Sequence, residues 1–169
     1  DKVIVSPMPA TDVEGGDTIT FRIDLFNSGD APAYDVVVTD VADELFINPA
    51  IGAGGPSGIT QGPTSGGTTT WTLDPIAGPI APMSTTSFTV AFDISNAVSP
   101  FENLTNRAGA TWTSTPGANG DERDGTGTPS QNDYQDDSPI VNVTVGPAGL
   151  TKSALSPLDG TIAIGEEVT

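Results

Sequence analysis

The sequence contains no cysteine and no histidine among its 169 residues. Without cysteine, the chain has no disulfide bonds, no thiolate nucleophile and no cysteine-ligated metal site. Without histidine, it lacks the commonest general base and the commonest transition-metal ligand. Paired carboxylates are then the only acid and base available, and they fall in loops with no defined cleft. We therefore predict that the chain is not an enzyme, and that any cofactor is a hard cation bound by oxygen.

Basic residues are also scarce. Five Lys and Arg stand against 22 Asp and Glu, for a net charge of −17. Such a chain repels the phosphate backbone of nucleic acids and anionic lipid headgroups. No apolar run approaches the roughly 18 residues of a membrane span, and the N-terminus lacks the basic and hydrophobic regions of a signal peptide. We expect no nucleic-acid partner and no membrane insertion, and a chain that is either cytosolic or cut from the middle of a longer protein.

What the sequence does contain is alternation of apolar and polar residues, clearest between Asp17 and Asp40. Ile19, Phe21, Ile23 and Leu25 alternate with polar residues, which is the period of a strand with one buried face. Turn formers at 27–32 interrupt the pattern, and a β-branched run at 34–39 resumes it. This stretch predicts two strands joined by a loop.

The remaining strands are predicted at 2–5, 68–74, 85–94, 105–114 and 139–145, with a bulge near Ala91. Residues 45–47 are expected to plug one end of the core, and 49–67 to form a surface loop. Seven main strands and no helical period predict an all-β fold, an immunoglobulin-like Greek-key sandwich. The expected core comprises Phe21, Ile23, Val37, Trp71, Phe88 and Trp112.

The end of the sequence repeats its beginning. Residues 151–157, TKSALSP, resemble 1–7, DKVIVSP, and residues 165–169, GEEVT, resemble 16–20, GDTIT. The offset changes only from 150 to 149, which favours a tandem repeat. We predict one sandwich unit at 1–146, followed at 147–169 by a linker and the first strand of the next unit. Neighbouring copies of the same unit are then the expected partners, with assembly into a homopolymer or lateral association of chains left open.

The order of these blocks also resembles a known family. The blocks that carry the resemblance are, in order, GDTITFRIDLFNSGDAPAYDVVVTD, WTL, NLTNRAGATWTSTPG, ERDG, NDYQDDS and the closing LTKS and IGEEVT. The chain is similar to the repeat domain of large bacterial surface and fimbrial proteins, catalogued as domain of unknown function eleven. The resemblance covers nearly the whole chain. It implies a non-catalytic spacer of an extracellular filament or adhesin, placed between a distal tip and a cell-surface anchor. The acidic composition without cysteine agrees with an extracellular location.

Some members of that family form an intramolecular isopeptide bond between Lys and Asn, promoted by a buried acid. Lys2 stands where the family lysine would, and Asn106 or Asn142 could be the acceptor. Asp24 is the acid considered, but its position in the alternation predicts that it faces water. An acid that must stay protonated needs an apolar pocket that raises its pKa. We therefore expect no isopeptide bond, for want of a buried acid.

Acidic residues gather in two regions that suit calcium, which takes six to eight oxygen ligands. One region lies in the loop before the last strand, at the N-terminal end of the sandwich, and the other is expected at the opposite end. The candidate ligands are Asp121, Asp124, Asp133, Asp136 and Asp137 in the first region, and Asp12, Asp17 and Asp40 in the second. Calcium shared between the regions of successive units would rigidify their junction. The alternative is a solvated acidic surface that binds nothing specifically.

A binding module is the rival function. Tyr134 lies in the acidic loop and is the best exposed aromatic for a carbohydrate- or protein-binding surface. Trp71 and Trp112 fall beside core residues, which indicates burial instead. Asn103 begins an N-glycosylation sequon at a loop edge and is a candidate for glycan attachment.

Overall fold

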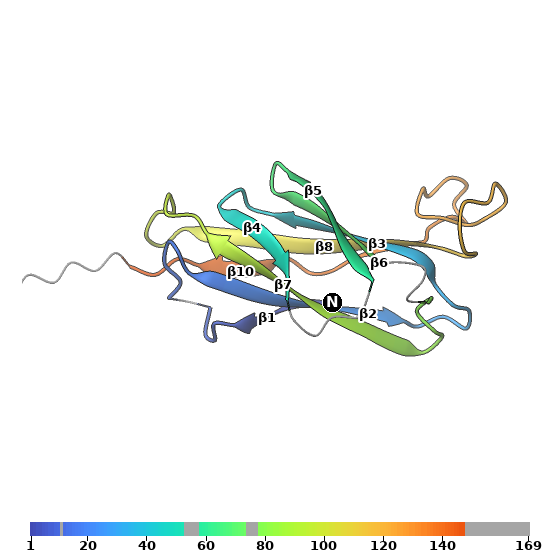
Figure 1. Cartoon of the computed structure of the whole chain (residues 1–169), viewed down its shortest axis with the longest axis horizontal. Helices are drawn as coiled ribbons and strands as arrows, with labels where there is room; N and C mark the ends of the chain where they lie inside the picture. The colour runs from blue at the N-terminus through green and yellow to red at the C-terminus, as the bar shows by residue number, and fades with distance from the viewer. Residues whose placement is uncertain (11, 53–57, 74–77, 148–169) are drawn as a thin grey trace, which may run out of the picture.

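In the computed structural model the chain is an all-β sandwich of two antiparallel sheets (Figure 1). The structure describes residues 1–10, 12–52, 58–73 and 78–147. Within these ranges there is no helix, and so none that could span a membrane. The predicted fold class is confirmed. The expected linker and first strand of a next unit fall almost entirely outside the described residues, so the tandem repeat stays a prediction.

The first sheet has four strands in the order β1-β2-β7-β4. They are β1 (Lys2–Ser6), β2 (Thr18–Asn27), β7 (Ser84–Ile94) and β4 (Phe46–Ile51). The pairing of β2 with β7 continues without a shift from Thr18 opposite Asp93 to Asn27 opposite Ser84. β1 is half as long as β2 and pairs only with its first part, from Thr20 to Ile23. The sheet therefore has one edge that β1 covers incompletely.

The second sheet follows the order β10-β8-β3-β6-β5, with β9 beside β8. Its strands are β3 (Tyr34–Ala42), β5 (Ile59–Ser65), β6 (Thr68–Leu73), β8 (Asn103–Thr113), β9 (Gln135–Asp137) and β10 (Val141–Thr144). β8 lies between β3 on one side and β10 and β9 on the other. β8 therefore pairs with three other strands of the second sheet.

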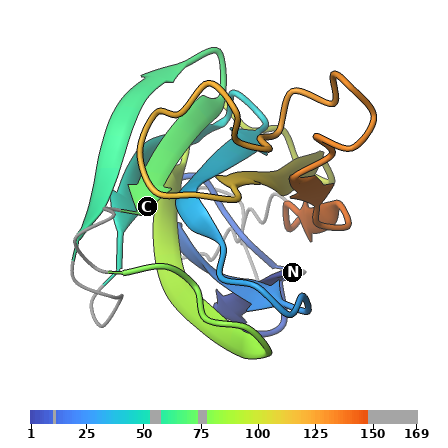
Figure 2. The same cartoon turned by 90° about the vertical axis from the view of Figure 1, so that its right-hand side faces the viewer.

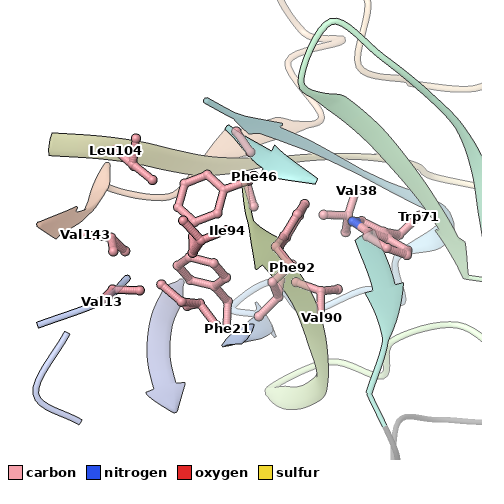
Figure 3. Close-up of a cluster of buried hydrophobic side chains, with 14 of the residues drawn as sticks. Val13, Phe21, Val38, Phe46, Trp71, Val90, Phe92, Ile94, Leu104 and Val143 are labelled. Atoms are coloured by element: carbon pink, nitrogen blue, oxygen red, sulfur yellow. The ribbon is translucent and has the colours of Figure 1, made fainter. Parts of the chain in front are cut away.

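The core lies between the sheets and is rich in aromatic residues (Figure 3). Phe21, Phe46 and Phe92 meet edge to face, with ring centroids 5.7–6.0 Å apart. Such contacts add to the burial of large apolar side chains, which is the main force that holds two sheets together. A smaller cluster of Ala33, Val36 and Ile80 occupies the end of the sandwich where β2 finishes.

Two expectations about the strands are wrong. Residues 49–67, expected as a surface loop, contain part of β4 and all of β5. The bulge expected near Ala91 is absent from the ladder between β2 and β7; the irregularity lies in β4, between Ile47 and Ala50. Polar strands such as β5 carry little apolar alternation, so their pairing with a neighbour is decided by the sheet and not by local sequence.

Most of the expected core is confirmed. Phe21, Ile23, Trp71 and Phe88 are buried, whereas Val37 and Trp112 are only half-buried. In β3 the inward residues are Val36 and Val38, because an extra residue interrupts the pairing with β8 between Tyr34 and Val37. Asp35 in this interruption has a φ of 47°, in the left-handed region.

Candidate functional site

A lysine and an aspartate are buried together between the two sheets. Lys2 Nζ lies 2.5 Å from Asp40 Oδ1, and both side chains are completely shielded from solvent. They come from strands 38 residues apart in the sequence. Charged residues are almost never fully buried without a partner, and even a paired set costs desolvation energy. A pair that the core retains at this cost is a candidate functional site.

An asparagine completes the group. Asn106 is fully buried on β8, where it pairs with Ala42 of β3, and Asp40 pairs with Ala108. Asp40 and Asn106 therefore lie on neighbouring strands with their side chains on the same inner face of the second sheet. Lys2 approaches from β1 in the opposite sheet. The three side chains thus connect the two halves of the sandwich.

The surroundings of the lysine are aromatic. Lys2 Nζ lies 4.7 Å from the centre of the Phe21 ring and 5.8 Å from that of Phe92. Both rings belong to the aromatic core in Figure 3, which also shows Trp71 nearby on β6. Such a shell excludes water and leaves only the neighbouring polar side chains to interact with the amine.

Burial shifts both pKa values toward the neutral forms. The pKa of Lys2 falls from 10.5 to about 8, because desolvation outweighs the attraction and hydrogen bond of Asp40. Desolvation raises the pKa of Asp40, although Lys2 and, more weakly, Trp71 and Asn106 oppose the change. A lowered lysine pKa favours the nucleophilic free amine, and a raised aspartate pKa favours a carboxyl group that can give up a proton.

Several polar atoms at the site lack a hydrogen bond. Within the described part of the chain, Asp40 Oδ2, Trp71 Nε1 and both side-chain polar atoms of Asn106 have no partner of standard geometry. Trp71 and Asn106 nevertheless lie close enough to Asp40 to stabilise its charged form. Each unsatisfied buried group costs about 1–3 kcal/mol. The cost is greatest at Asn106, because neither polar atom of its buried carboxamide has a hydrogen bond. The reactive groups of the site are therefore buried together without satisfying one another's hydrogen-bonding capacity.

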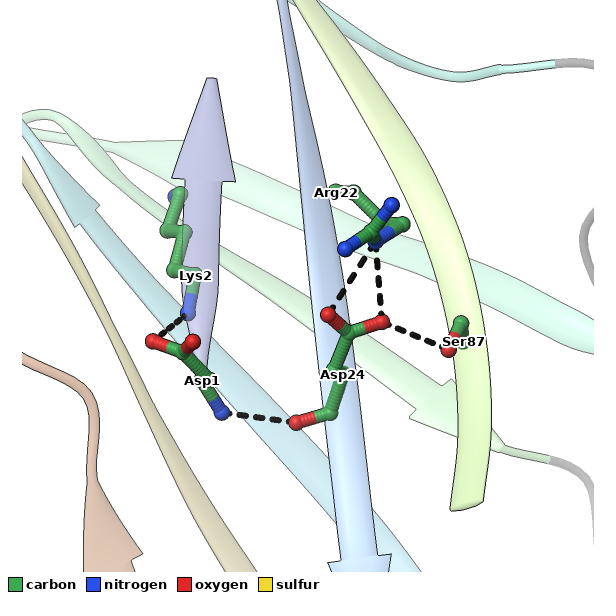
Figure 4. Close-up of polar contacts among 5 residues, drawn as sticks. All are labelled: Asp1, Lys2, Arg22, Asp24 and Ser87. Atoms are coloured by element: carbon green, nitrogen blue, oxygen red, sulfur yellow. Dashed lines mark hydrogen bonds and ion pairs between the residues drawn. The ribbon is translucent and has the colours of Figure 1, made fainter. Parts of the chain in front are cut away.

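The expectation that the chain has no buried acid is wrong. Asp24, the acid considered from the sequence, does lie on the outer face, where its carboxylate accepts hydrogen bonds from Arg22 and Ser87 (Figure 4). The buried acid is Asp40, which the sequence interpretation assigned to a calcium cluster. Asp40 shares its position in the alternation with Val36 and Val38, but Val37 makes the opposite face of β3 apolar as well, so the sequence alone left the direction of Asp40 open.

Of the two candidate acceptors, only Asn106 lies beside Asp40, the carboxyl group that pairs with the lysine. Asn142 lies exposed on β10, where its Oδ1 accepts a hydrogen bond from Asn103 Nδ2 at 3.1 Å. Asn103, the glycosylation candidate, is likewise exposed. Glycan attachment there stays a prediction.

The candidate calcium ligands do not converge. Segment 12–17 lies at one end of the sandwich and the acidic loop at 115–134 at the other (Figure 1). Among the described residues no three acidic side chains are grouped so that they could hold a metal ion. Asp40 forms a buried ion pair with Lys2, and Asp137 forms an ion pair with Arg107 at 3.3 Å. Calcium shared between the ends of successive units, from Asp12, Asp17 and the acidic loop, stays a prediction.

The candidate binding aromatic is half-buried. Tyr134 packs against Trp112, with ring centroids 5.9 Å apart, at the end of the sandwich that carries the acidic loop. The tyrosine therefore supports the loop as well as contributing to its surface.

Comparisons with known proteins agree on the fold. No protein-family model and no curated protein matches the chain. Among solved structures, the C-terminal domain of the antigen I/II polypeptide BspA from Streptococcus agalactiae superposes with a TM-score of 0.58 at 11% identity over 86% of this chain. The major pilin subunit BcpA of Bacillus cereus gives 0.54 at 15% over 87%, and domains D2 and D3 of the major pilin SpaD from Corynebacterium diphtheriae give 0.54 at 16% over 84%.

The chain covers only 49%, 39% and 50% of these three structures, respectively. At such identities the likeness establishes a shared sandwich architecture. The chain thus has a fold that occurs in bacterial adhesins and pilins, while its activity and partners must be argued from its own residues.

Proposed function

We propose that this chain is a structural domain of a bacterial cell-surface filament or adhesin stalk, locked by an isopeptide bond between Lys2 and Asn106. The observation that carries the proposal is the buried Lys2–Asp40 pair beside a fully buried asparagine without hydrogen bonds. The likeness to pilin and adhesin domains supports the surface role.

The three side chains suffice for the reaction. The neutral amine of Lys2 attacks Cγ of Asn106 while the Asp40 carboxyl group polarises the carbonyl oxygen. Asp40 then relays a proton from the lysine nitrogen to the amide nitrogen. The Cγ–Nδ2 bond breaks, ammonia leaves, and a Cγ–Nζ amide bond replaces it, with no change in oxidation state. Lys2 and Asn106 are both buried beside Asp40, so the reaction needs little further loss of entropy, and exclusion of water protects the product.

The bond would change how the domain bears tension. β1 begins at Lys2, and the chain leaves the sandwich beyond β10, at the end where Val13 and Val145 form a bridge. A bond from Lys2 to Asn106 carries force directly from the first strand to β8, so residues 3–105 lie outside the path of the load. Only the segment 107–145 could then extend, which suits a spacer in a filament.

Intact-mass measurement of the folded chain tests the proposal. The bond expels ammonia, so we expect a mass about 17 Da below that calculated from the sequence. Lys2→Ala, Asp40→Ala and Asn106→Ala should each restore the calculated mass for their composition. Asn142→Ala, at an exposed asparagine on the neighbouring strand, is the matched control and should keep the deficit. A wild-type mass equal to the calculated value, in protein that is folded by circular dichroism, would refute the bond.

A carbohydrate- or protein-binding role remains the alternative function. The half-buried Tyr134 beside the acidic loop is the feature that favours it. Specific saccharide binding by the domain that is lost in Tyr134→Ala would support this alternative.

A further inference from the structure

An apolar groove opens at the incompletely covered edge of the first sheet. A cavity of about 540 Å³ lies between β2 and the β8–β9 side of the second sheet. Its apolar lining includes Ile23, Leu25, Val36, Ile80, Ala110 and Trp112. The side chains on β8 here are small, since Ala108, Gly109 and Ala110 follow one another. The groove is therefore a place where the sandwich core lacks a side chain.

The edge of β2 beside this groove can accept more strand. The Asp24 N–H donates to Asp1 O at 2.9 Å, and the Asp1 nitrogen donates to Asp24 O at 2.7 Å. This reciprocal pair of hydrogen bonds places Asp1 directly opposite Asp24, one residue beyond the pairing of Lys2 with Ile23. In an antiparallel ladder alternate residues face the same edge, so the next N–H and C=O to point there belong to Phe26. Figure 2 shows the N-terminus on this open side of the sandwich.

The register fixes where a preceding residue would point. Lys2 lies opposite Ile23 and its side chain faces the core. A residue directly before Asp1 would lie opposite Leu25 and share the inward direction of Lys2, because directions alternate along a strand. Its side chain would enter the groove between Leu25 and Trp112, both of which line it.

The sequence supplies a residue of the right kind. Thr151-Lys152 repeats Asp1-Lys2, and the residue directly before it is Leu150. In a chain of successive units, Leu150 would therefore occupy the inward position, while Gly149 would occupy the outward position beside Phe26. An apolar residue falls on the parity that faces the groove, and glycine falls on the other.

We propose that the groove is the docking site for the linker between successive copies of this domain. The Gly149–Leu150 linker of one copy extends β1 of the next, and the leucine fills the next copy's core between Leu25 and Trp112. The proposal rests on the filament or stalk role in the proposed function and on the tandem repeat predicted from the sequence, but not on the isopeptide bond. It makes the linker part of the following domain, so that the junction is held by backbone hydrogen bonds and buried apolar surface.

Two extended proteins of equal composition test this docking. The full chain is extended before Asp1 either by Pro-Ala-Gly-Leu, the sequence of residues 147–150, or by Pro-Ala-Leu-Gly. Only the first places leucine on the inward parity. We expect it to unfold about 3–10 °C higher than the second, as burial of one leucine in a domain of this size predicts. Hydrogen exchange at the Phe26 amide should also slow in the first protein.

A blocking substitution provides the control. Ala110→Phe should fill the groove from β8 and abolish the difference between the two extended proteins. Equal melting temperatures for the two proteins without this substitution, with Phe26 exchanging equally fast in both, would overturn the proposal. A difference that grows with protein concentration would also overturn it, because the groove would then take a second molecule in trans. Intact mass of each sample reports the Lys2–Asn106 bond separately, so failure of one proposal is distinguishable from failure of the other.

Discussion

Asn106→Ala should lower the stability of the domain far more than the loss of one polar side chain would. If Lys2 and Asn106 are joined, the bond closes a loop between positions 2 and 106 and restricts the unfolded chain. A cross-link around a loop of about 100 residues contributes about 5 kcal/mol by this effect, on the scale used for disulfides. For a domain of this size that corresponds to a fall in melting temperature of about 10–20 °C. Alanine also leaves the Lys2–Asp40 pair in place, so the main loss is that of the cross-link.

The measurement is thermal unfolding followed by circular dichroism, with intact mass on the same samples. Asn142→Ala is again the control and should change the melting temperature by no more than a degree or two, because surface substitutions usually change stability by less than 0.5 kcal/mol. Equal melting temperatures for wild type and Asn106→Ala would contradict the cross-link argument. So would an equally large fall in Asn142→Ala.

Three further predictions concern charge, backbone and metal. In Asn106→Ala, the free energy of unfolding should fall as pH rises above about 4, because the raised pKa of Asp40 favours its protonated form in the folded state. It should rise again between about pH 8 and 10.5, because the folded state lowers the pKa of Lys2. Urea unfolding midpoints measured across this pH range would show both changes. Gly67→Ala should cost about 1–3 kcal/mol, since φ is +75° and a Cβ would lie 2.1 Å from a carbonyl oxygen, whereas Gly66→Ala, at φ +54° with open space, should cost less in the same chemical denaturation. A protein of two units should melt higher and scatter as a more rigid particle in millimolar calcium than in sodium at matched ionic strength; identical behaviour in calcium and chelator would leave the acidic loops a solvated surface.

Local alternation in the sequence was enough to predict the sandwich and most of its core. Ile19, Phe21 and Ile23 sit in β2 as predicted, because one face of a strand must be apolar wherever that face is buried. The same reasoning missed β5, whose residues are mostly polar and exposed. It also failed at β3, where three consecutive valines make both faces apolar and leave the inward one undecided.

Composition and alternation were thus enough to predict the all-β class and the lack of thiol and imidazole chemistry, and the family resemblance pointed to Lys2 with Asn106 or Asn142 as candidate partners. The acid beside them, Asp40, became apparent from the folded structure alone. The irregular pairing at Asp35 sets the inward parity of β3, and this parity turns Asp40 into the core instead of toward solvent. Residues 2, 40 and 106 lie on three strands of two sheets, so their meeting depends on strand order and register, which are long-range properties. The groove beside β2 has the same origin, because its lining combines residues of β2 with small residues of β8 from the opposite sheet.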